Sequence, residues 1–401
     1  GSGFPTGEGV GRIGIAVYPE NPSIIYAVLD NNFRKTGERR TEPTQNDSVY
    51  VLKDFENISK EEFAKLDDKK LDRFLRRNRF AQKYTASSVK SLVAENKISP
   101  LAVHEYLYDA STAMVSQPII GAEVYRSDNG GISWKKTNEK DLDIYSSFGY
   151  YFGKIYVSPY NPNKGITSLL STDGGKTFKT IDKPHVHADH HALWINPKKD
   201  AHIIIGNDGG LNISYDDGAH WFKANTPPVG QFYAIQVDNA RPYNVYGGFQ
   251  DNGTWIGPSN YNFSYKWYDV GDYPYKRLGG GDGMQVMVDS RDNKTIYSGS
   301  QFGFYNRRTY PGRPNLTIYP RHELGEEKLR YNWQTPILLS THNQDVFYYG
   351  TNRFHRSLNK GDSLVALSSD LTQGGKPGDV PYGTLTTISE SPLKFGLLYT
   401  G

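Results

Sequence analysis

The stretch Ser171-Thr172-Asp173-Gly174-Gly175-Lys176-Thr177-Phe178 decides the fold, because it returns twice in this chain with little change. The other copies are Ser-Asp-Asn-Gly-Gly-Ile-Ser-Trp at 127–134 and Ser-Tyr-Asp-Asp-Gly-Ala-His-Trp at 214–221, so the three lie 44 and 43 residues apart. In such a turn an Asp carboxylate accepts backbone N–H groups, and glycine allows a positive φ. The octet therefore predicts a tight β-hairpin turn that recurs once per repeat. We expect its structural carboxylates to be Asp128, Asp173 and Asp216.

The three octets resemble the Asp-box, or bacterial neuraminidase repeat (BNR), family, whose pattern is Ser/Thr-x-Asp-x-Gly-x-Thr-Trp. In that family each copy lies in one blade of a β-propeller. The resemblance therefore implies that this chain forms a β-propeller.

A second phrase, an apolar alternating strand followed by a polar turn and another strand, occurs seven times. Its first strands are centred on Val17, Val157, Ile195, Val237, Val288, Leu339 and Ile388. From Val157 onward these centres are 38 to 51 residues apart, the length of a four-stranded blade with its loops. We therefore predict an all-β fold, a β-propeller of about seven four-stranded blades, with the last blade incomplete in this chain. Because an unpaired sheet edge is a liability, we expect the missing strands outside this sequence, which we interpret as a piece of something longer.

Residues 32–120 follow a different pattern and predict a helical insertion in the first blade. Ser59-Lys60-Glu61-Glu62 is a capping box, and Ser99-Pro100 is a further helix start. The predicted domains are thus a propeller at 1–31 and 121–401 and a helical insertion at 32–120. A basic group in the insertion could dock an acidic partner, although a solvated helix face is the favoured interpretation. Its members are Arg73, Arg76, Arg77, Arg79 and Lys83.

Composition argues against several kinds of partner. The net charge is only +3, so a nucleic-acid partner lacks its usual electrostatic footprint. With no cysteine in the chain, disulfides and thiolate metal sites are excluded. No run of eighteen apolar residues occurs, and we expect no membrane span in this chain.

The densest polar cluster is His185-Val186-His187-Ala188-Asp189-His190-His191, just before a predicted inner strand. Strand alternation places His187, Asp189 and His191 on one face and His190 on the other. Histidine and carboxylate together predict a site for a divalent metal, Zn²⁺ or Ca²⁺, formed by His187, Asp189 and His191. The favoured interpretation is a hydrogen-bonded network that fixes the order of the blades, and the metal site is the alternative.

Three glycine-rich segments fall at related places in their blades: 206–210, 247–253 and 279–283. In the first of them Asp208 is interpreted as a turn residue. Asp251 and Asp282 can be turn residues as well, or a pair of carboxylates for acid and base chemistry. We expect a ligand to contact His187, Asp189, His190, Gln250 and Asn252.

These segments, with 189–194, look like the large bacterial "BNR-repeat glycosyl hydrolase" proteins and the sortilin (VPS10) propeller domain, over residues 10–30 and 121–401. The resemblance implies a secreted, periplasmic or outer-membrane-associated bacterial protein that binds a peptide or glycan, or a scaffold that joins a larger envelope complex through its helical insertion. The alternative is a glycoside hydrolase using Asp251 and Asp282. Sialidase activity is not expected, because Gly11-Arg12-Ile13-Gly14 has glycine where the sialidase phrase has an aromatic residue and proline.

Overall fold

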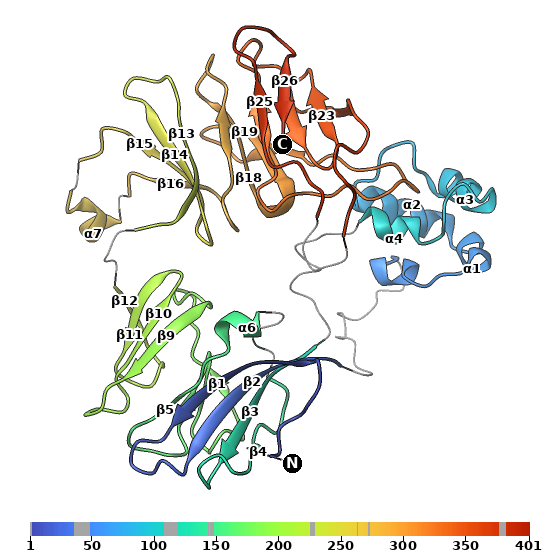
Figure 1. Cartoon of the computed structure of the whole chain (residues 1–401). Coiled ribbons are helices and arrows are strands. Elements are labelled where there is room, and N and C mark those ends of the chain that lie inside the picture. The colour runs from blue at the N-terminus through green and yellow to red at the C-terminus, as the bar shows by residue number, and fades with distance from the viewer. Residues whose placement is uncertain are drawn as a thin grey trace. The chain divides into compact units, whose positions relative to one another are not determined.

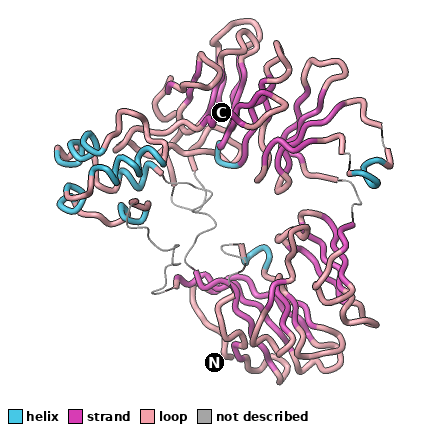
Figure 2. Tube along the Cα trace, turned by 180° about the vertical axis from the view of Figure 1, so that it is seen from behind, coloured by secondary structure: helices cyan, strands magenta, loops and turns pink. Residues whose placement is uncertain are grey.

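The computed structural model describes residues 2–35, 49–107, 119–142, 144, 148–224, 229–262, 264–271, 273–376 and 382–401. The chain divides into two compact units, Gly1–Arg39 with Met114–Gly230 and Arg40–Ala113 with Gln231–Gly401. Figure 1 labels many of the helices and strands of both units, and Figure 2 shows the same chain coloured by secondary structure.

The first unit contains three antiparallel sheets of four strands, each paired in chain order. The first sheet consists of β1 (Val10–Val17), β2 (Ile25–Arg34), β3 (Ile119–Ser127) and β4 (Lys135–Lys136). The second consists of β5 (Tyr156–Val157), β6 (Gly165–Ile166), β7 (Leu169–Ser171) and β8 (Lys179–Thr180). The third consists of β9 (His190–Ile195), β10 (Ile203–Asn207), β11 (Gly210–Ser214) and β12 (Phe222–Ala224). A short helix, α6 (Gly149–Phe152), precedes β5.

The second unit continues the series with three four-stranded sheets and one two-stranded sheet. The first is β13 (Phe232–Val237), β14 (Asn244–Phe249), β15 (Gly253–Pro258) and β16 (Lys276–Gly279), with α7 (Lys266–Val270) before β16. The next is β17 (Val286–Val288), β18 (Thr295–Ser300), β19 (Phe304–Thr309) and β20 (Pro314–Ile318), with the 3₁₀ turn η2 (Gln301–Gly303) between β18 and β19. The last two are β21 (Ile337–Leu339), β22 (Phe347–Gly350), β23 (Phe354–Ser357) and β24 (Val365–Ala366), and then β25 (Ile388–Glu390) with β26 (Leu398–Thr400).

The predicted fold class is confirmed. The described residues form seven antiparallel sheets, each built like a propeller blade, and the last has two strands where the others have four. A buried tyrosine in the second strand is a recurring core residue: Tyr26, Tyr246, Tyr297 and Tyr348 are each at most 1% exposed. Aromatic residues pack well on a pleated surface, which explains part of the high tyrosine content.

The turns formed by the three octets join the third and fourth strands of their sheets. In the turn between β7 and β8, the Asp173 carboxylate accepts the N–H groups of Lys176 at 3.1 Å and Thr177 at 3.0 Å, and Ser171 Oγ accepts that of Gly175 at 2.9 Å. Burial raises the pKa of Asp173, but the bonds from Thr177, Ser171 and Lys176 outweigh it and lower that pKa to about 2. The N–H and side chain of His220 likewise lower the pKa of Asp216 to about 2.

The prediction for Asp128 needs correction. In the turn between β3 and β4 it is Asn129 whose Oδ1 accepts the N–H of Ser133, at 3.0 Å. Asp128 precedes that position by one residue, and its carboxylate pairs with Arg126 Nε at 2.8 Å. An amide oxygen accepts N–H groups as a carboxylate does, and Asn359 does the same for Ser363 between β23 and β24.

The helical segment lies between β2 and β3 in the chain but belongs to the second compact unit. It consists of the 3₁₀ helix η1 (Leu52–Phe55), α1 (Lys60–Ala64), α2 (Asp68–Arg77), α3 (Ala86–Ala94) and α4 (Ala102–Tyr106). The capping box is present, with Ser59 Oγ accepting the N–H of Glu62 at 3.2 Å. Leu324, in the chain between β20 and β21, joins the core of these helices, and Lys83 pairs with Glu323 at 2.6 Å. A docking role for its basic residues stays a prediction. Among the described residues no helix is long and apolar enough to cross a membrane.

Antiparallel strand order divides each blade into two ends. The turns after the first and third strands lie at one end, which we call the Asp-box end. The turns between the second and third strands, and the links that lead into the next blade, lie at the other, which we call the link end. The site residues predicted at 187–191, 250–252 and 282 all belong to the link ends of their blades.

Candidate functional site

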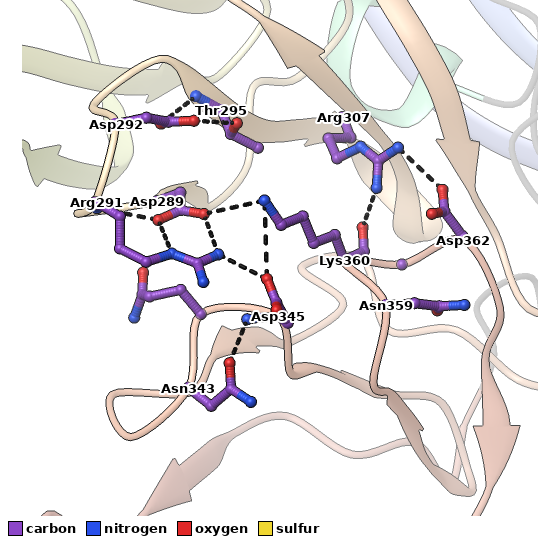
Figure 3. A network of polar contacts seen from close by, with 12 residues as sticks. Asp289, Arg291, Asp292, Thr295, Arg307, Asn343, Asp345, Asn359, Lys360 and Asp362 are labelled. Atoms are coloured by element: carbon purple, nitrogen blue, oxygen red, sulfur yellow. Dashed lines mark hydrogen bonds and ion pairs between the residues drawn. The ribbon is translucent and has the colours of Figure 1, made fainter.

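The polar network drawn in Figure 3 lies at the Asp-box ends of the β17–β20 and β21–β24 blades. Arg291 binds Asp289 through Nε at 2.9 Å and Nη2 at 2.7 Å, and it also reaches Asp345 at 2.7 Å. Lys360 Nζ lies 3.8 Å from Asp289 and 3.7 Å from Asp345. Arg291 lowers the pKa of Asp289, whose side chain is 1% exposed. Because each carboxylate here faces a cation, we interpret this blade-lock network (Asp289, Arg291, Asp345 and Lys360) as structural.

A group of a different kind lies at the link end of the β9–β12 blade. His187 and Asp189 lie in the link before β9, and Asp208 lies in the turn between β10 and β11. One potential ligand atom of each residue lies within 4.8 Å of those of the other two. We call these three residues the histidine–carboxylate cluster.

Local backbone bonds bring the two segments of the cluster together. The N–H of Asp208 donates to the carbonyl of Asp189 at 3.3 Å, and the N–H of Asp189 donates to His187 Nδ1 at 3.3 Å. Gly209 leaves room for His187, because a Cβ at that glycine would lie 3.1 Å from the His187 Cβ. Lys223 Nζ would be 3.6 Å from the same point. The cluster is half-buried, with side chains 24% to 37% exposed, so solvent reaches it.

The other histidines of the segment point to separate partners. His191 Nε2 contacts the carboxylate of Asp208, and its ring lies 5.3 Å from that of Tyr151 in α6. His190 is buried and its Nε2 pairs with Asp182 at 2.8 Å, while His185 Nε2 contacts the Trp221 carbonyl at 2.9 Å. The structure therefore places His187 next to Asp189, whereas His191 Nε2 lies against the Asp208 carboxylate. The metal site itself stays a prediction.

The electrostatics of the cluster favour a positive charge. Burial raises the pKa of Asp189; neighbouring His187 partly counters this, and the Asp208 carboxylate raises it further. Two carboxylates and an imidazole are donor groups that divalent metals use in proteins. The cluster therefore has both the charge and the donor types that a divalent cation requires.

Asp251 and Asp282 meet at the link end of the β13–β16 blade. The N–H of Asp251 donates to Asp282 Oδ1 at 2.7 Å, and Asp282 is 6% exposed. Asp251 has a φ of 61°, in the left-handed region. The turn also needs Gly253, because a Cβ there would lie 2.1 Å from the carbonyl oxygen of Gly279.

Aromatic and amide side chains that the sequence did not single out surround this pair. Gln301 Oε1 accepts the N–H of Asp282 at 3.2 Å. Burial raises the pKa of Tyr233; a bond from Trp333 Nε1 at 3.1 Å counters this, and the charges of Asp282 and Asp251 raise it further. Tyr233 lies in β13, and the other four residues come from four successive turns and links, so a pattern within one strand could not reveal them. We call Tyr233, Asp251, Asp282, Gln301 and Trp333 the aromatic–acid cluster.

The two clusters belong to different compact units. The predicted ligand-contact set is therefore divided, with His187, Asp189 and His190 in the first unit and Gln250 and Asn252 in the second. One site that contains all five stays a prediction.

Comparisons with known proteins give only weak structural likenesses. No protein-family model and no curated protein matches this chain. A solved GH74 enzyme of Niastella koreensis is similar over 90% of this chain and 59% of its own, with 10% identity and a TM-score of 0.29. A GH74 xyloglucanase of Xanthomonas campestris is similar over 87% of this chain and 45% of its own, with 10% identity and a TM-score of 0.27.

A third solved structure, YCF48 from Cyanidioschyzon merolae, covers 67% of this chain and 82% of its own, at 13% identity and a TM-score of 0.25. The chain thus spans less than two thirds of the GH74 structures. Likenesses this weak carry no information on activity or ligand.

Proposed function

We propose that this protein is a ligand-binding module of the β-propeller class whose aromatic–acid cluster contacts a glycan. The observation that carries the proposal is the 2.7 Å bond from the Asp251 N–H to the Asp282 carboxylate, which is itself buried. A carboxylate used in this way holds the 250–253 turn in place. A general acid or nucleophile instead needs its oxygen directed at the substrate.

The side chains around this turn suit a ligand rich in hydroxyl groups. Trp333 and Tyr233 are half-buried and offer ring surfaces with one polar edge each. Asn252 follows Asp251 in the sequence and is exposed. Amide and carboxylate groups exchange hydrogen bonds with sugar hydroxyls. As part of the same proposal, the protein acts outside the bacterial cytoplasm, where Asp-box proteins are found.

One observation favours a second candidate, a glycoside hydrolase that uses Asp251 and Asp282. Asp251 holds a φ of 61°, and non-glycine residues in sparsely populated conformations concentrate at functional sites. The two functions differ in a measurable way, because a hydrolase releases reducing ends and a binding module does not.

Calorimetric titration of the full chain with a panel of soluble polysaccharides tests the proposal, with reducing ends assayed in the same samples. We expect at least one polysaccharide to bind without release of reducing ends, and Trp333→Ala to weaken that binding at least tenfold. Asn315→Ala, at an exposed position of β20, is the matched control and should bind like the parent chain.

Two outcomes would overturn the proposal. Release of reducing ends that disappears in a folded Asp251→Asn variant would establish the hydrolase. Failure of every polysaccharide to bind, with binding of a member of a defined peptide library by the same protein, would replace the glycan by a peptide.

A further inference from the structure

We propose that His187, Asp189 and Asp208 bind one divalent first-row transition-metal ion and that His191 positions Asp208 for this role. The site would be additional to the glycan contact above, and it lies in the other compact unit. The two proposals can therefore fail separately.

The geometry of the donors comes first. Nitrogen and oxygen ligands lie about 2.1 Å from a zinc ion, so donors around one ion are roughly 3 to 4 Å apart. The three donors here lie within 4.8 Å of one another, and His187 Nδ1 is 3.6 Å from Asp189 Oδ2. Small side-chain rotations, with release of the bond from the Asp189 N–H to His187 Nδ1, would bring all three onto one ion.

His191 supplies the second observation. Its Nε2 contacts Asp208 Oδ1, and Lys154 Nζ fixes the backbone of His191 through a 2.5 Å bond to its carbonyl oxygen. In metal sites a partner of this kind orients the ligand and tunes its basicity. The ring of His191 in turn packs against those of Tyr151 and Phe152, with centroid distances of 5.3 Å and 5.5 Å. The carboxylate of Asp208 is thus held in one orientation before a metal arrives.

The charge of the site agrees with a cation. Asp189 and Asp208 contribute two carboxylates, and one oxygen of each lies within 4.8 Å of the other. Lys223 Nζ lies near this turn, 3.6 Å from where a Cβ at Gly209 would be. We expect the amine to move away when a metal binds.

The donor set indicates the class of metal. One imidazole nitrogen with two carboxylate oxygens suits Zn²⁺, Co²⁺ or Mn²⁺. Ca²⁺ takes six to eight oxygen ligands, so it is expected to bind more weakly here. Three protein ligands leave at least one position for water or for an oxygen of a bound molecule.

The test uses the untagged full chain, stripped of metal with EDTA and then titrated with Zn²⁺ by calorimetry. We expect one equivalent to bind, and Asp189→Asn and Asp208→Asn each to weaken binding at least tenfold. His191→Phe should keep the stoichiometry and weaken binding by about 10-fold to 100-fold. With Co²⁺ as the probe, the visible absorption band of the parent protein should be lost in the Asp208→Asn variant.

A matched control is available in the same unit. His220 Nδ1 lies 2.7 Å from Asp216 Oδ2 at the Asp-box end, so His220→Ala removes another histidine next to a carboxylate and should leave Zn²⁺ affinity unchanged. Absence of one-to-one binding in the parent chain would overturn the proposal. So would unchanged affinity in Asp189→Asn, whose half-exposed side chain makes it the safer variant if Asp208→Asn fails to fold. Unchanged affinity in His191→Phe alone would remove the positioning role.

Discussion

The blade-lock network and the histidine–carboxylate cluster use the same residue type in opposite ways. In the blade-lock network, Asp289 is buried and Arg291 donates hydrogen bonds to both of its carboxylate oxygens. These bonds lower the pKa of Asp289. In the histidine–carboxylate cluster, Asp189 and Asp208 face each other beside a histidine, and burial raises the pKa of Asp189. The first arrangement stabilises the folded chain, whereas the second keeps two donors close together at a cost.

Asp173 and Asp216, the carboxylates of two octet turns, resemble Asp289 of the blade-lock network, because their pKa values are also lowered. Asp173 and Asp216 both accept backbone N–H groups, and their pKa values fall to about 2. The Asp-box end of a blade thus contains carboxylates whose hydrogen bonds favour the charged form. Variants that separate these two uses of aspartate are the sharpest tests of the comparison.

Arg291→Ala is expected to have the largest effect on stability. It removes the bidentate partner of Asp289, which is 1% exposed, and it also releases Asp345. The substitution leaves the buried Asp289 carboxylate with Lys360, 3.8 Å away, as its remaining cation, so we expect a loss of about 2 kcal/mol in the free energy of unfolding. Urea denaturation followed by tyrosine and tryptophan fluorescence measures this loss.

Arg313→Ala is the control for this prediction, because Arg313 is an exposed arginine just before β20 of the same unit. Its stability should stay within about 0.5 kcal/mol of that of the parent chain. Equal stability of the two variants would show that the blade-lock network contributes nothing measurable.

Asp173→Ala is expected to have an intermediate effect. Ser171, Lys176 and Thr177 lose a shared acceptor, but the turn is exposed and water replaces part of the lost bonding. We expect a loss of about 1.5 kcal/mol in the same denaturation experiment. Asp173→Asn should cost less than Asp173→Ala, because Asn129 and Asn359 hold the same position in their own turns.

The pH dependence of the Asp173→Asn difference tests the charge of Asp173. The pKa of Asp173 is lowered to about 2 in the folded chain, so its charge stabilises the fold above the unfolded value of about 3.8. This contribution is lost as the pH falls through 2. The stability difference between the parent chain and Asp173→Asn should therefore shrink between pH 4 and pH 2, and a constant difference would contradict the prediction.

The repeated turns and strands allowed the fold to be predicted from sequence because they are local. Each octet specifies a hairpin turn, and the seven copies of the strand–turn–strand phrase correspond to seven sheets. The docking of the helical segment could not be predicted in this way. Its core includes Leu324, and no pattern relates that residue to a helix that begins at Asp68.

The sites were predictable only in part, for a similar reason. Strand alternation grouped His187 and Asp189 with His191, but β9 begins at His190, so the period of two does not extend back into the link. Asp208 follows β10, the strand that pairs with β9. The register of these two strands, rather than sequence spacing, brings Asp208 close to Asp189. Tyr233 and Trp333 meet although they are 100 residues apart.

Asp189→Asn in the metal-free chain is expected to have the smallest effect on stability. We expect a gain in stability, whereas Arg291→Ala in the blade-lock network is expected to cause a loss. The substitution keeps the size of the side chain and removes one of two like charges that face each other. Because both side chains are partly exposed, solvent screens most of their repulsion, and we expect a gain of less than about 0.5 kcal/mol at pH 7 in EDTA. A loss comparable to that of Arg291→Ala would mean that the fold stabilises the Asp189 carboxylate as it does that of Asp289. The distinction between the histidine–carboxylate cluster and the blade-lock network would then disappear.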